Sequence, residues 1–187
     1  MTVIRKNLIG GDPVENINPS NHNGVVGLYA RATEEHTGRA IAATKDALVS
    51  WSRSGMLRCH AVLRATAGEI FARKQKLGEI LSEGIAEVTR AGQIFDFFTG
   101  EALRLAGETL PSIRLGVGVE MTREPVGVVG IITPWNFPMA ILASKLAPAI
   151  CYGNTVVIKP ADRVPRGTWK LVDILKRAGL PRRRRAW

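Results

Sequence analysis

The chain has 187 residues, of which 45% are hydrophobic, so it is long enough for one domain with a buried core and too short for the two or three domains of most nucleotide-dependent enzymes. Its formal net charge is +10, and four of these charges come from the consecutive residues Arg182 to Arg185. No aromatic residues are interleaved with this basic run, and the other basic residues are dispersed along helical patterns, so we do not expect nucleic-acid binding.

Cysteine usage and the N-terminus indicate the compartment. Cys59 and Cys151 are the only cysteines, and they form neither a disulfide framework nor a CxxC motif. The first 15 residues contain no apolar stretch of the kind found in secretory signals. We therefore expect a cytoplasmic protein, and the histidines show no spacing that predicts a metal site.

One uncharged stretch, from Pro125 to Ser144, is long enough to cross a membrane. It contains Pro125, Pro134 and Pro138, and each of these would interrupt helical hydrogen bonding in lipid. We therefore interpret the stretch as a buried strand followed by a buried helix, without a membrane partner.

The first part of the chain, residues 1–110, is predicted to contain loops and packing helices. Residues 1–30 carry turn signals around short apolar pieces, which are typical of loops and short strands. Apolar residues then recur at helical spacing in three segments, at about 34–51, 55–76 and 83–105. Such stripes usually face a core, so we assign these helices to packing.

Residues 111–181 change to a strand–helix–strand–helix order. The alternation over 117–123 predicts a half-exposed strand, and the apolar run 126–133 predicts a strand buried on both faces. Pro138 suits the first turn of a helix that runs to about Tyr152. The pattern then predicts, in order, a chain reversal at Gly153-Asn154, a short buried strand over 155–159 and a helix over 164–177. Crossovers of this length favour a parallel sheet.

Polar residues gather where these strands end. Trp135-Asn136 follows the first buried strand, and Lys159 ends the second. Ligands of open α/β sheets bind in the crevice outside the carboxyl ends of the strands. The segment 123–162 therefore predicts half of a cofactor site.

Three consecutive segments carry a family resemblance: REPVGVV at 123–129, TPWNFP at 133–138 and YGNTVVIKPAD at 152–162. Together they closely resemble the NAD(P)-dependent aldehyde dehydrogenase superfamily, and the similarity extends from about Asn18 to Pro181. In their amino-acid sequence, segments such as EVTRAGQIFDFF are most similar to the 2-oxoglutarate-semialdehyde (2,5-dioxopentanoate) dehydrogenases. The resemblance implies the α/β fold of an incomplete N-terminal part of a Rossmann-like coenzyme domain.

In this family a cysteine thiolate attacks the aldehyde, hydride passes to NAD(P)⁺ and water releases the acid. The resemblance implies that the Asn136 side chain helps to form an oxyanion hole and that Lys159 binds the adenosine ribose. Asp162, where the family commonly has Glu, would accept a hydrogen bond from a ribose 2′-hydroxyl, which favours NAD over NADP. Ile132 and Trp135 would line the nicotinamide side of the pocket.

Simpler interpretations compete with these roles. Asn136 precedes Phe137-Pro138 and could be a helix N-cap. Lys159 in isolation would be a surface lysine at a strand end. Lys145 matches a family lysine, but a lone helical lysine often lies along the surface with its charge in water.

The sequence also departs from the family pattern. Residues 81–84 run directly into the third helix, which predicts a short deletion, and Ser144 stands where many relatives carry Trp. The chain ends before the family's nucleophilic Cys and general-base Glu, and residues 182–187 form an atypical basic tail, for which a frameshift after Pro181 is our hypothesis.

We therefore expect one truncated coenzyme-binding domain over 1–187, from a family that oxidises small aldehydes with NAD(P)⁺ and is usually homo-oligomeric. The chain alone is expected to be inactive. The alternative is a non-catalytic interaction fragment that pairs with a full-length relative through the strand at 117–123.

Overall fold

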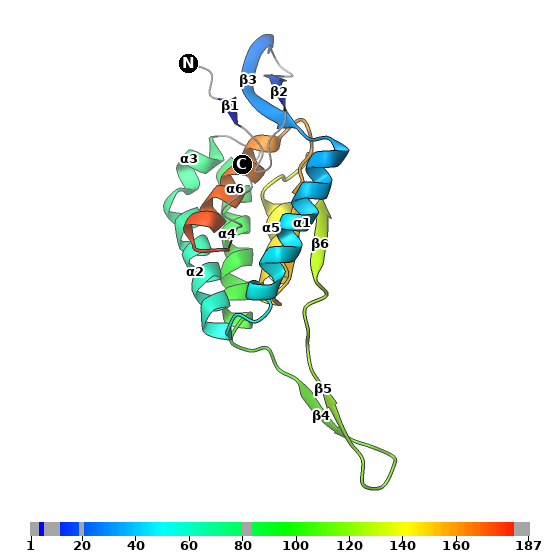
Figure 1. Cartoon of the computed structure of the whole chain (residues 1–187). Coiled ribbons are helices and arrows are strands. Elements are labelled where there is room, and N and C mark those ends of the chain that lie inside the picture. The colour runs from blue at the N-terminus through cyan, green and yellow to red at the C-terminus, as the bar shows by residue number, and fades with distance from the viewer. Residues whose placement is uncertain (1–3, 6–11, 19–20, 80–83, 182–187) are drawn as a thin grey trace.

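The computed structural model describes residues 4–5, 12–18, 21–79 and 84–181 (Figure 1). The helices of this part are α1 Glu34–Trp51, α2 Met56–Ala72, α3 Lys74–Gly78, α4 Gly84–Glu101, α5 Ala140–Cys151 and α6 Pro165–Arg177. Its strands are β1 Ile4–Arg5, β2 Asp12–Asn18, β3 Asn21–Arg31, β4 Glu108–Pro111, β5 Gly118–Met121, β6 Val128–Ile132 and β7 Thr155–Lys159. The predicted deletion around 81–84 falls mainly, and the basic tail wholly, outside these residues.

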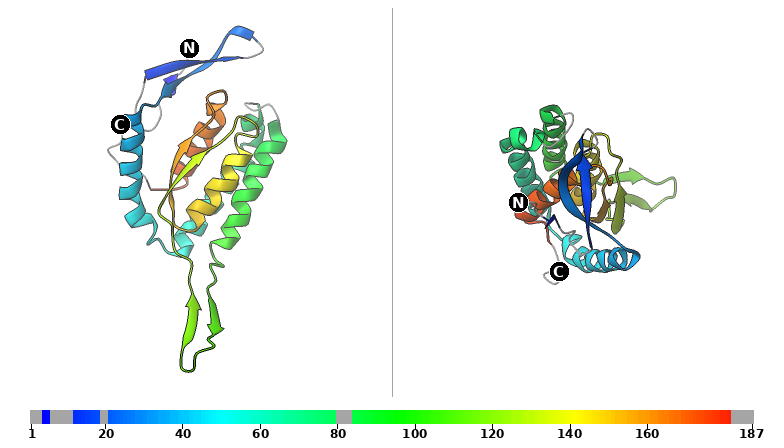
Figure 2. Two further views of the ribbon diagram at one scale, coloured as in Figure 1. Left: turned by 90° about the vertical axis from the view of Figure 1, so that its right-hand side faces the viewer. Right: turned by 90° about the horizontal axis from the view of Figure 1, so that it is seen from above.

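The strands form three separate sheets. One has the order β1-β3-β2, the second is the β4–β5 hairpin, and the third is the pair β6–β7. Figure 2 shows the first sheet and the hairpin at opposite ends of the helical body. Strands β6 and β7 are parallel and are connected through α5, which confirms the predicted strand–helix–strand unit.

The N-terminal strands are longer than the short pieces expected for residues 1–30. Strand β3 has 11 residues and pairs antiparallel with β2 along its length. Asn18 and Asn21 are register partners, so residues that we expected to form loops belong to the two strands.

The helix predictions hold best where local capping signals exist. Helix α1 has the predicted bounds, and Thr33 caps it by accepting a hydrogen bond from the His36 backbone N–H at 3.4 Å. The predicted second helix is instead divided at Arg73 into α2 and α3. The division lets Gly78 approach α4 closely, where an added Cβ would lie only 2.9 Å from the backbone nitrogen of Ile85. The third helix ends at Glu101, earlier than predicted.

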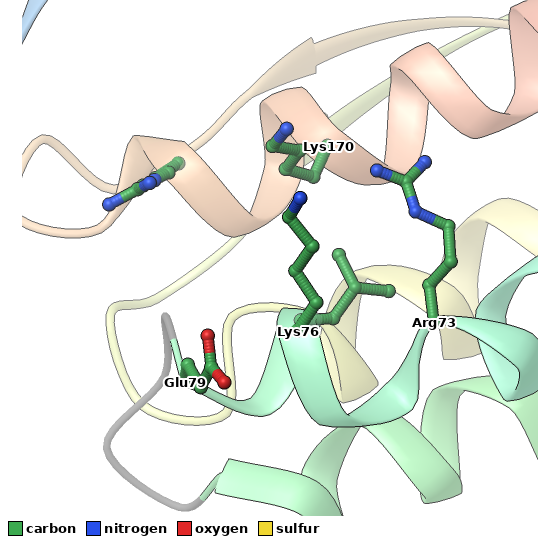
Figure 3. A pocket seen from close by; sticks show the side chains of 6 residues that line it. Arg73, Lys76, Glu79 and Lys170 are labelled. Carbon is green, nitrogen blue, oxygen red and sulfur yellow. The ribbon is translucent and has the colours of Figure 1, made fainter.

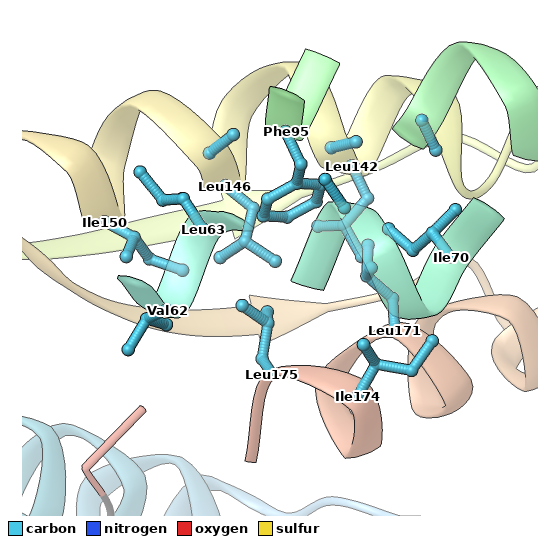
Figure 4. Packing of buried hydrophobic residues seen from close by; sticks show 14 of the residues in the cluster. Val62, Leu63, Ile70, Phe95, Leu142, Leu146, Ile150, Leu171, Ile174 and Leu175 are labelled. Carbon is cyan, nitrogen blue, oxygen red and sulfur yellow. The ribbon is translucent and has the colours of Figure 1, made fainter. Parts of the chain in front are cut away.

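The core lies between the helices and one face of the β6–β7 pair. Figure 4 shows side chains of α2, α4 and α5 meeting those of α6. The fully buried large side chains of this cluster are Trp51, Leu63, Ile70, Leu77, Phe95, Met139, Leu142, Leu146, Ile150, Leu171, Ile174 and Leu175. The indole of Trp51 is satisfied within it, because its Nε1–H donates to the Ile150 carbonyl at 3.2 Å.

Helix α5 ends in the predicted reversal. Gly153 has a φ of +76°, its N–H donates to the Ile150 carbonyl, and the Asn154 N–H donates to the Ala149 carbonyl at 2.9 Å. This is a Schellman motif, which requires a residue that adopts left-handed φ without strain. The Asn154 side chain then accepts from the Gly127 N–H at 2.9 Å and so joins the end of α5 to the start of β6.

The burial predicted for the strands is wrong in three places. Within β6 only Ile131 is buried and Ile132 is 81% exposed, because the described elements cover the two faces of this sheet incompletely. Strand β7 is half-buried for the same reason. Strand β5 is exposed at every residue, because the described structure pairs it with β4 alone.

Two leucines on α2 test this core. Leu63 is fully buried and Leu57 is 76% exposed, so Leu63→Ala should lower the free energy of unfolding by about 2–5 kcal/mol through lost burial and an added cavity. The matched Leu57→Ala variant should change it by less than about 0.5 kcal/mol. Urea unfolding followed by circular dichroism measures both values. Equal effects would contradict the packing described for α2.

Candidate functional site

The two predicted strand ends meet at one edge of the β6–β7 sheet. Ile132 is the register partner of Lys159, and the Thr133 N–H donates to the Lys159 carbonyl at 3.3 Å. Because both strands end here, the segment after β6 and the segment after β7 leave the sheet side by side. The sequence-based expectation that these two polar segments share one edge is therefore confirmed.

The segment after β6 is a turn over residues 133–139 with an exposed centre and a buried end. Trp135 and Asn136 are exposed, and in the described part of the chain the Asn136 side chain makes no hydrogen bond. Phe137 has a φ of +49°, a left-handed conformation that costs a residue with a Cβ roughly 1–2 kcal/mol. Pro138 and Met139 are buried and anchor the turn.

The structure does not support an N-cap role for Asn136. Helix α5 begins at Ala140 with Met139 as its N-cap, so Pro138 lies in the preceding turn and not in the first turn of the helix as predicted. The first free N–H groups of the helix are satisfied from another element, which leaves the Asn136 amide available to a ligand.

Glu87 of α4 is the residue that satisfies them. Its Oε1 accepts from the Met139 N–H at 2.6 Å and from the Ala140 N–H at 3.2 Å, and the residue is only 3% exposed. A carboxylate is favoured at a helix N-terminus by the unpaired N–H groups and by the helix dipole. Sequence reasoning missed Glu87, although an acid four residues before Ala91 and seven before Ile94 lies on the buried side of a helix.

The residues predicted to bind the ribose lie next to each other. The Lys159 ammonium forms an ion pair with the Asp162 carboxylate at 2.9 Å, and the two side chains are 60% and 90% exposed. An exposed pair of this kind contributes at most about 1 kcal/mol to stability, so a ligand can reorganise it at low cost.

Two apolar side chains accompany this polar pair at the sheet edge. Ile132 is 81% exposed and Trp135 is 61% exposed, which is unusual for side chains of this size. Apolar surface beside a few convergent polar groups is typical of ligand sites. The remaining candidate, Lys145, is exposed on α5, and Ser144 beside it is half-buried with its hydroxyl donating to the Ile141 carbonyl.

Neither cysteine has the properties of a catalytic thiolate. Cys151 is 1% exposed and Cys59 is 4% exposed. Burial raises the pKa of the Cys151 thiol to about 11 and also raises the pKa of Cys59. A nucleophilic cysteine needs a lowered pKa and solvent access, and Cys151 has neither.

A hollow lies between α3 and the start of α6 (Figure 3). It has a volume of about 250 Å³, and its lining is rich in cations. The lining residues are Arg73, Lys76, Leu77, Glu79, Arg166 and Lys170. None of the five predicted site residues contributes to it.

Parallel strands joined by a crossover helix, with polar groups at their common carboxyl edge, define the class of open α/β proteins that bind ligands at that edge. The chain belongs to the aldehyde dehydrogenase family, because the model of that family matches residues 9–183. The matched range contains every predicted site residue.

Characterised relatives agree with this assignment. The chain is 36% identical over 179 residues to the alpha-ketoglutaric semialdehyde dehydrogenase of Bacillus subtilis, covering 91% of this chain and 37% of that protein. It is 37% identical over 180 residues to the 2,5-dioxopentanoate dehydrogenase of Saccharolobus solfataricus, with the same coverage. The chain thus spans about 37% of the length of these relatives.

Two crystal structures show the same fold over 91% of this chain and 37% of theirs. An NADP-dependent enzyme from E. coli superimposes with a TM-score of 0.87 at 28% identity. A betaine aldehyde dehydrogenase from Staphylococcus aureus, a point mutant solved in complex with NAD⁺, superimposes with a TM-score of 0.85 at 30% identity. In the described part of our chain, no helix combines the length and the apolar character needed to cross a bilayer.

The cysteine environment gives a direct prediction. At pH 8 a thiol with a pKa of about 11 is ionised in only about one molecule in a thousand, so Cys151 should react with iodoacetamide about a hundredfold more slowly than free cysteine. The rate should increase as the pH rises toward 11, because the thiolate fraction increases.

Mass spectrometry of the labelled peptides separates Cys151 from Cys59, and urea-unfolded protein is the control in which both should react rapidly. Fast labelling of Cys151 at pH 8 in the folded chain would show that the thiol is accessible and ionised, contrary to its position here.

Proposed function

We propose that this chain supplies the oxyanion and ribose-binding parts of a site that oxidises an aldehyde to a carboxylic acid with NAD(P)⁺. The observation that carries the proposal is the register of β6 and β7, which brings the Asn136 turn and Lys159 to one sheet edge. Family membership supports the reaction type, and the exposed Asn136 amide supports its assignment as a donor.

The residues present fit a dinucleotide cofactor, whose nicotinamide would supply the hydride acceptor when bound. Lys159 and Asp162 are exposed at the edge, where a cation and a carboxylate can bond ribose hydroxyls. Ile132 and Trp135 offer apolar surface for the nicotinamide side. The Asn136 N–H would stabilise negative charge on the aldehyde oxygen, a role whose loss typically costs about 10²–10³-fold in rate.

NAD is the cofactor that we propose over NADP. The Asp162 carboxylate would accept a hydrogen bond from a ribose 2′-hydroxyl, and it would repel the 2′-phosphate of NADP. Because both cysteines are buried, we also propose that the 187-residue chain alone does not oxidise aldehydes.

For the substrate we propose an aldehyde that also carries a carboxylate. The names of the relatives support this class, since they include the semialdehydes of alpha-ketoglutarate, succinate, malonate and glutarate.

Calorimetric titration with NAD tests the cofactor site. We expect saturable binding, and Lys159→Ala should weaken it about tenfold to a hundredfold, because a hydrogen bond from a charged donor is worth about 1.5–3 kcal/mol. Lys74→Ala is the matched control, since it removes the same charge from an exposed position on α3 and should leave the affinity unchanged. Equal weakening by both variants would indicate a general charge effect, and no binding to the folded wild-type chain would overturn the proposed site.

The β4–β5 hairpin favours a second function, association with another chain of the family. The hairpin projects from the helical body (Figure 1), and among the strands that the structure describes β5 pairs with β4 alone. Large apolar side chains on the hairpin and its tip are exposed, and they are Leu110, Ile113, Leu115, Val117, Val119 and Met121. Exposed apolar surface beside an open strand edge is typical of interaction sites. We propose that the hairpin pairs with a second copy of this protein or with a longer relative.

The two faces of the hairpin allow a matched test. Leu110 and Val119 are cross-strand partners on one face, and Thr109 and Glu120 are partners on the other. Val119→Lys should weaken self-association about tenfold or more, because it places a charge in the apolar contact, whereas Thr109→Lys adds the same charge opposite Glu120 and should have little effect. Analytical ultracentrifugation over a concentration series measures the association, and a wild-type chain that stays monomeric throughout would exclude self-pairing.

A further inference from the structure

The turn that presents Asn136 has a conformation that its own residues do not favour. Phe137 adopts a φ of +49°, and it is 46% exposed, so packing of its ring does not fully explain the conformation. A left-handed non-glycine residue persists where neighbouring contacts determine the backbone on both sides. On the strand side, that contact is the Thr133 N–H bonded to the Lys159 carbonyl.

On the helix side, the contact is Glu87. Its Oε1 accepts two hydrogen bonds from consecutive backbone N–H groups, those of Met139 at 2.6 Å and Ala140 at 3.2 Å. The same turn continues into the helix, because the Ile141 N–H donates to the Phe137 carbonyl at 3.0 Å. The carboxylate therefore fixes the backbone two and three residues after Phe137, and three and four residues after Asn136.

Glu87 is itself held firmly. It lies in the first turn of α4, and its neighbours Val88 and Ala91 are fully buried in the core. Helix α4 packs directly against α5. A buried carboxyl oxygen that accepts from two N–H groups fixes the distance between the two helices, and a shift of either helix would break these contacts.

We infer that Glu87 is a positioning residue for Asn136: the bonds from its carboxylate to Met139 and Ala140 set the direction in which the Asn136 amide points. The link to catalysis rests on the proposed oxyanion role of Asn136. The link to the geometry of the turn does not, so the two can be tested separately.

The test uses the full 187-residue chain, labelled with ¹⁵N, and two NMR measurements. The first is hydrogen exchange of the Met139 and Ala140 amides, and the second is the position of the Asn136 side-chain NH₂ signals. In the wild-type chain both backbone amides should be protected, and rapid exchange of both would overturn the inference without any variant.

Two substitutions at Glu87 separate the effect of its hydrogen-bond acceptor from the effect of its side-chain volume. In Glu87→Ala, Met139 and Ala140 should exchange about tenfold faster or more, and the Asn136 side-chain signals should move, because both hydrogen bonds are lost. In Glu87→Gln the side-chain oxygen still accepts, so the Asn136 signals should remain close to their wild-type positions, with protection reduced less than in the alanine variant. If Glu87→Ala does not fold, Glu87→Gln still tests the inference, since displaced Asn136 signals with an intact core would overturn it.

Asn154→Ala is the matched control. Asn154 is also buried, and its side chain also accepts from a distant backbone N–H, that of Gly127, but it lies at the opposite ends of the strands. It should lower stability without moving the Asn136 signals. Unchanged Asn136 signals in a folded Glu87→Ala chain, or equal shifts in Asn154→Ala, would reduce Glu87 to general support of the fold.

NAD titration of the same samples keeps the proposals distinct. A wild-type chain that shows the Glu87-dependent signals but binds no NAD would contradict the cofactor proposal and leave the positioning role intact. NAD binding to a chain whose Asn136 signals do not respond to Glu87→Ala would support the cofactor proposal and contradict the positioning role of Glu87.

Discussion

The arrangement of the chain depends on helix α5 being fixed at both ends. At its start the buried Glu87 carboxylate binds the first N–H groups, and at its end Asn154 binds the N–H of Gly127. Between these ends α5 is buried against α2 and α4 on one side and the β6–β7 pair on the other. Strand β6 leads into α5, and β7 follows it. The position of this helix therefore determines where the two strand ends lie.

The site that results is defined by backbone geometry more than by side-chain contacts. Asn136, Lys159 and Asp162 are all exposed, and the ion pair between the last two is weak. What is constrained is the path of the chain on each side of them, through the parallel register and through the left-handed Phe137. In the site that we propose, this backbone would be arranged before a ligand arrives, which would lower the ordering cost of binding.

Much of the fold could be predicted because its signals are local. The helical spacing over 34–51 predicts α1, Gly153 marks the end of α5, and the crossover length between β6 and β7 favours parallel pairing. The TPWNFP and KPAD segments also indicated the aldehyde dehydrogenase family and predicted that two polar segments share one sheet edge. These features depend on residues within a few positions of one another, so the sequence shows them directly.

The missed features depend on distant partners. The Glu87 carboxyl group binds the backbone of Met139, 52 residues further along the chain. Its spacing from Ala91 and Ile94 indicates the buried side of α4, but the sequence does not show which N–H groups it binds. The apolar run of β6 indicates a strand suited to cover on both faces, but only the packing of the described elements shows that the Ile132 side chain is left exposed. The roles of Asn136 and Lys159 still rest on the family pattern together with their placement.

The stability of the β4–β5 hairpin depends little on the folding of the helical body. Its pairing is local, between residues 7 to 13 positions apart in the chain, and the apolar side chains that it carries face water. It therefore shares little of the cooperative stability of the helical body, and an isolated two-stranded hairpin is only marginally stable in water. Resistance of this segment to proteolysis consequently reports on whether another chain covers it, independently of whether the core has folded.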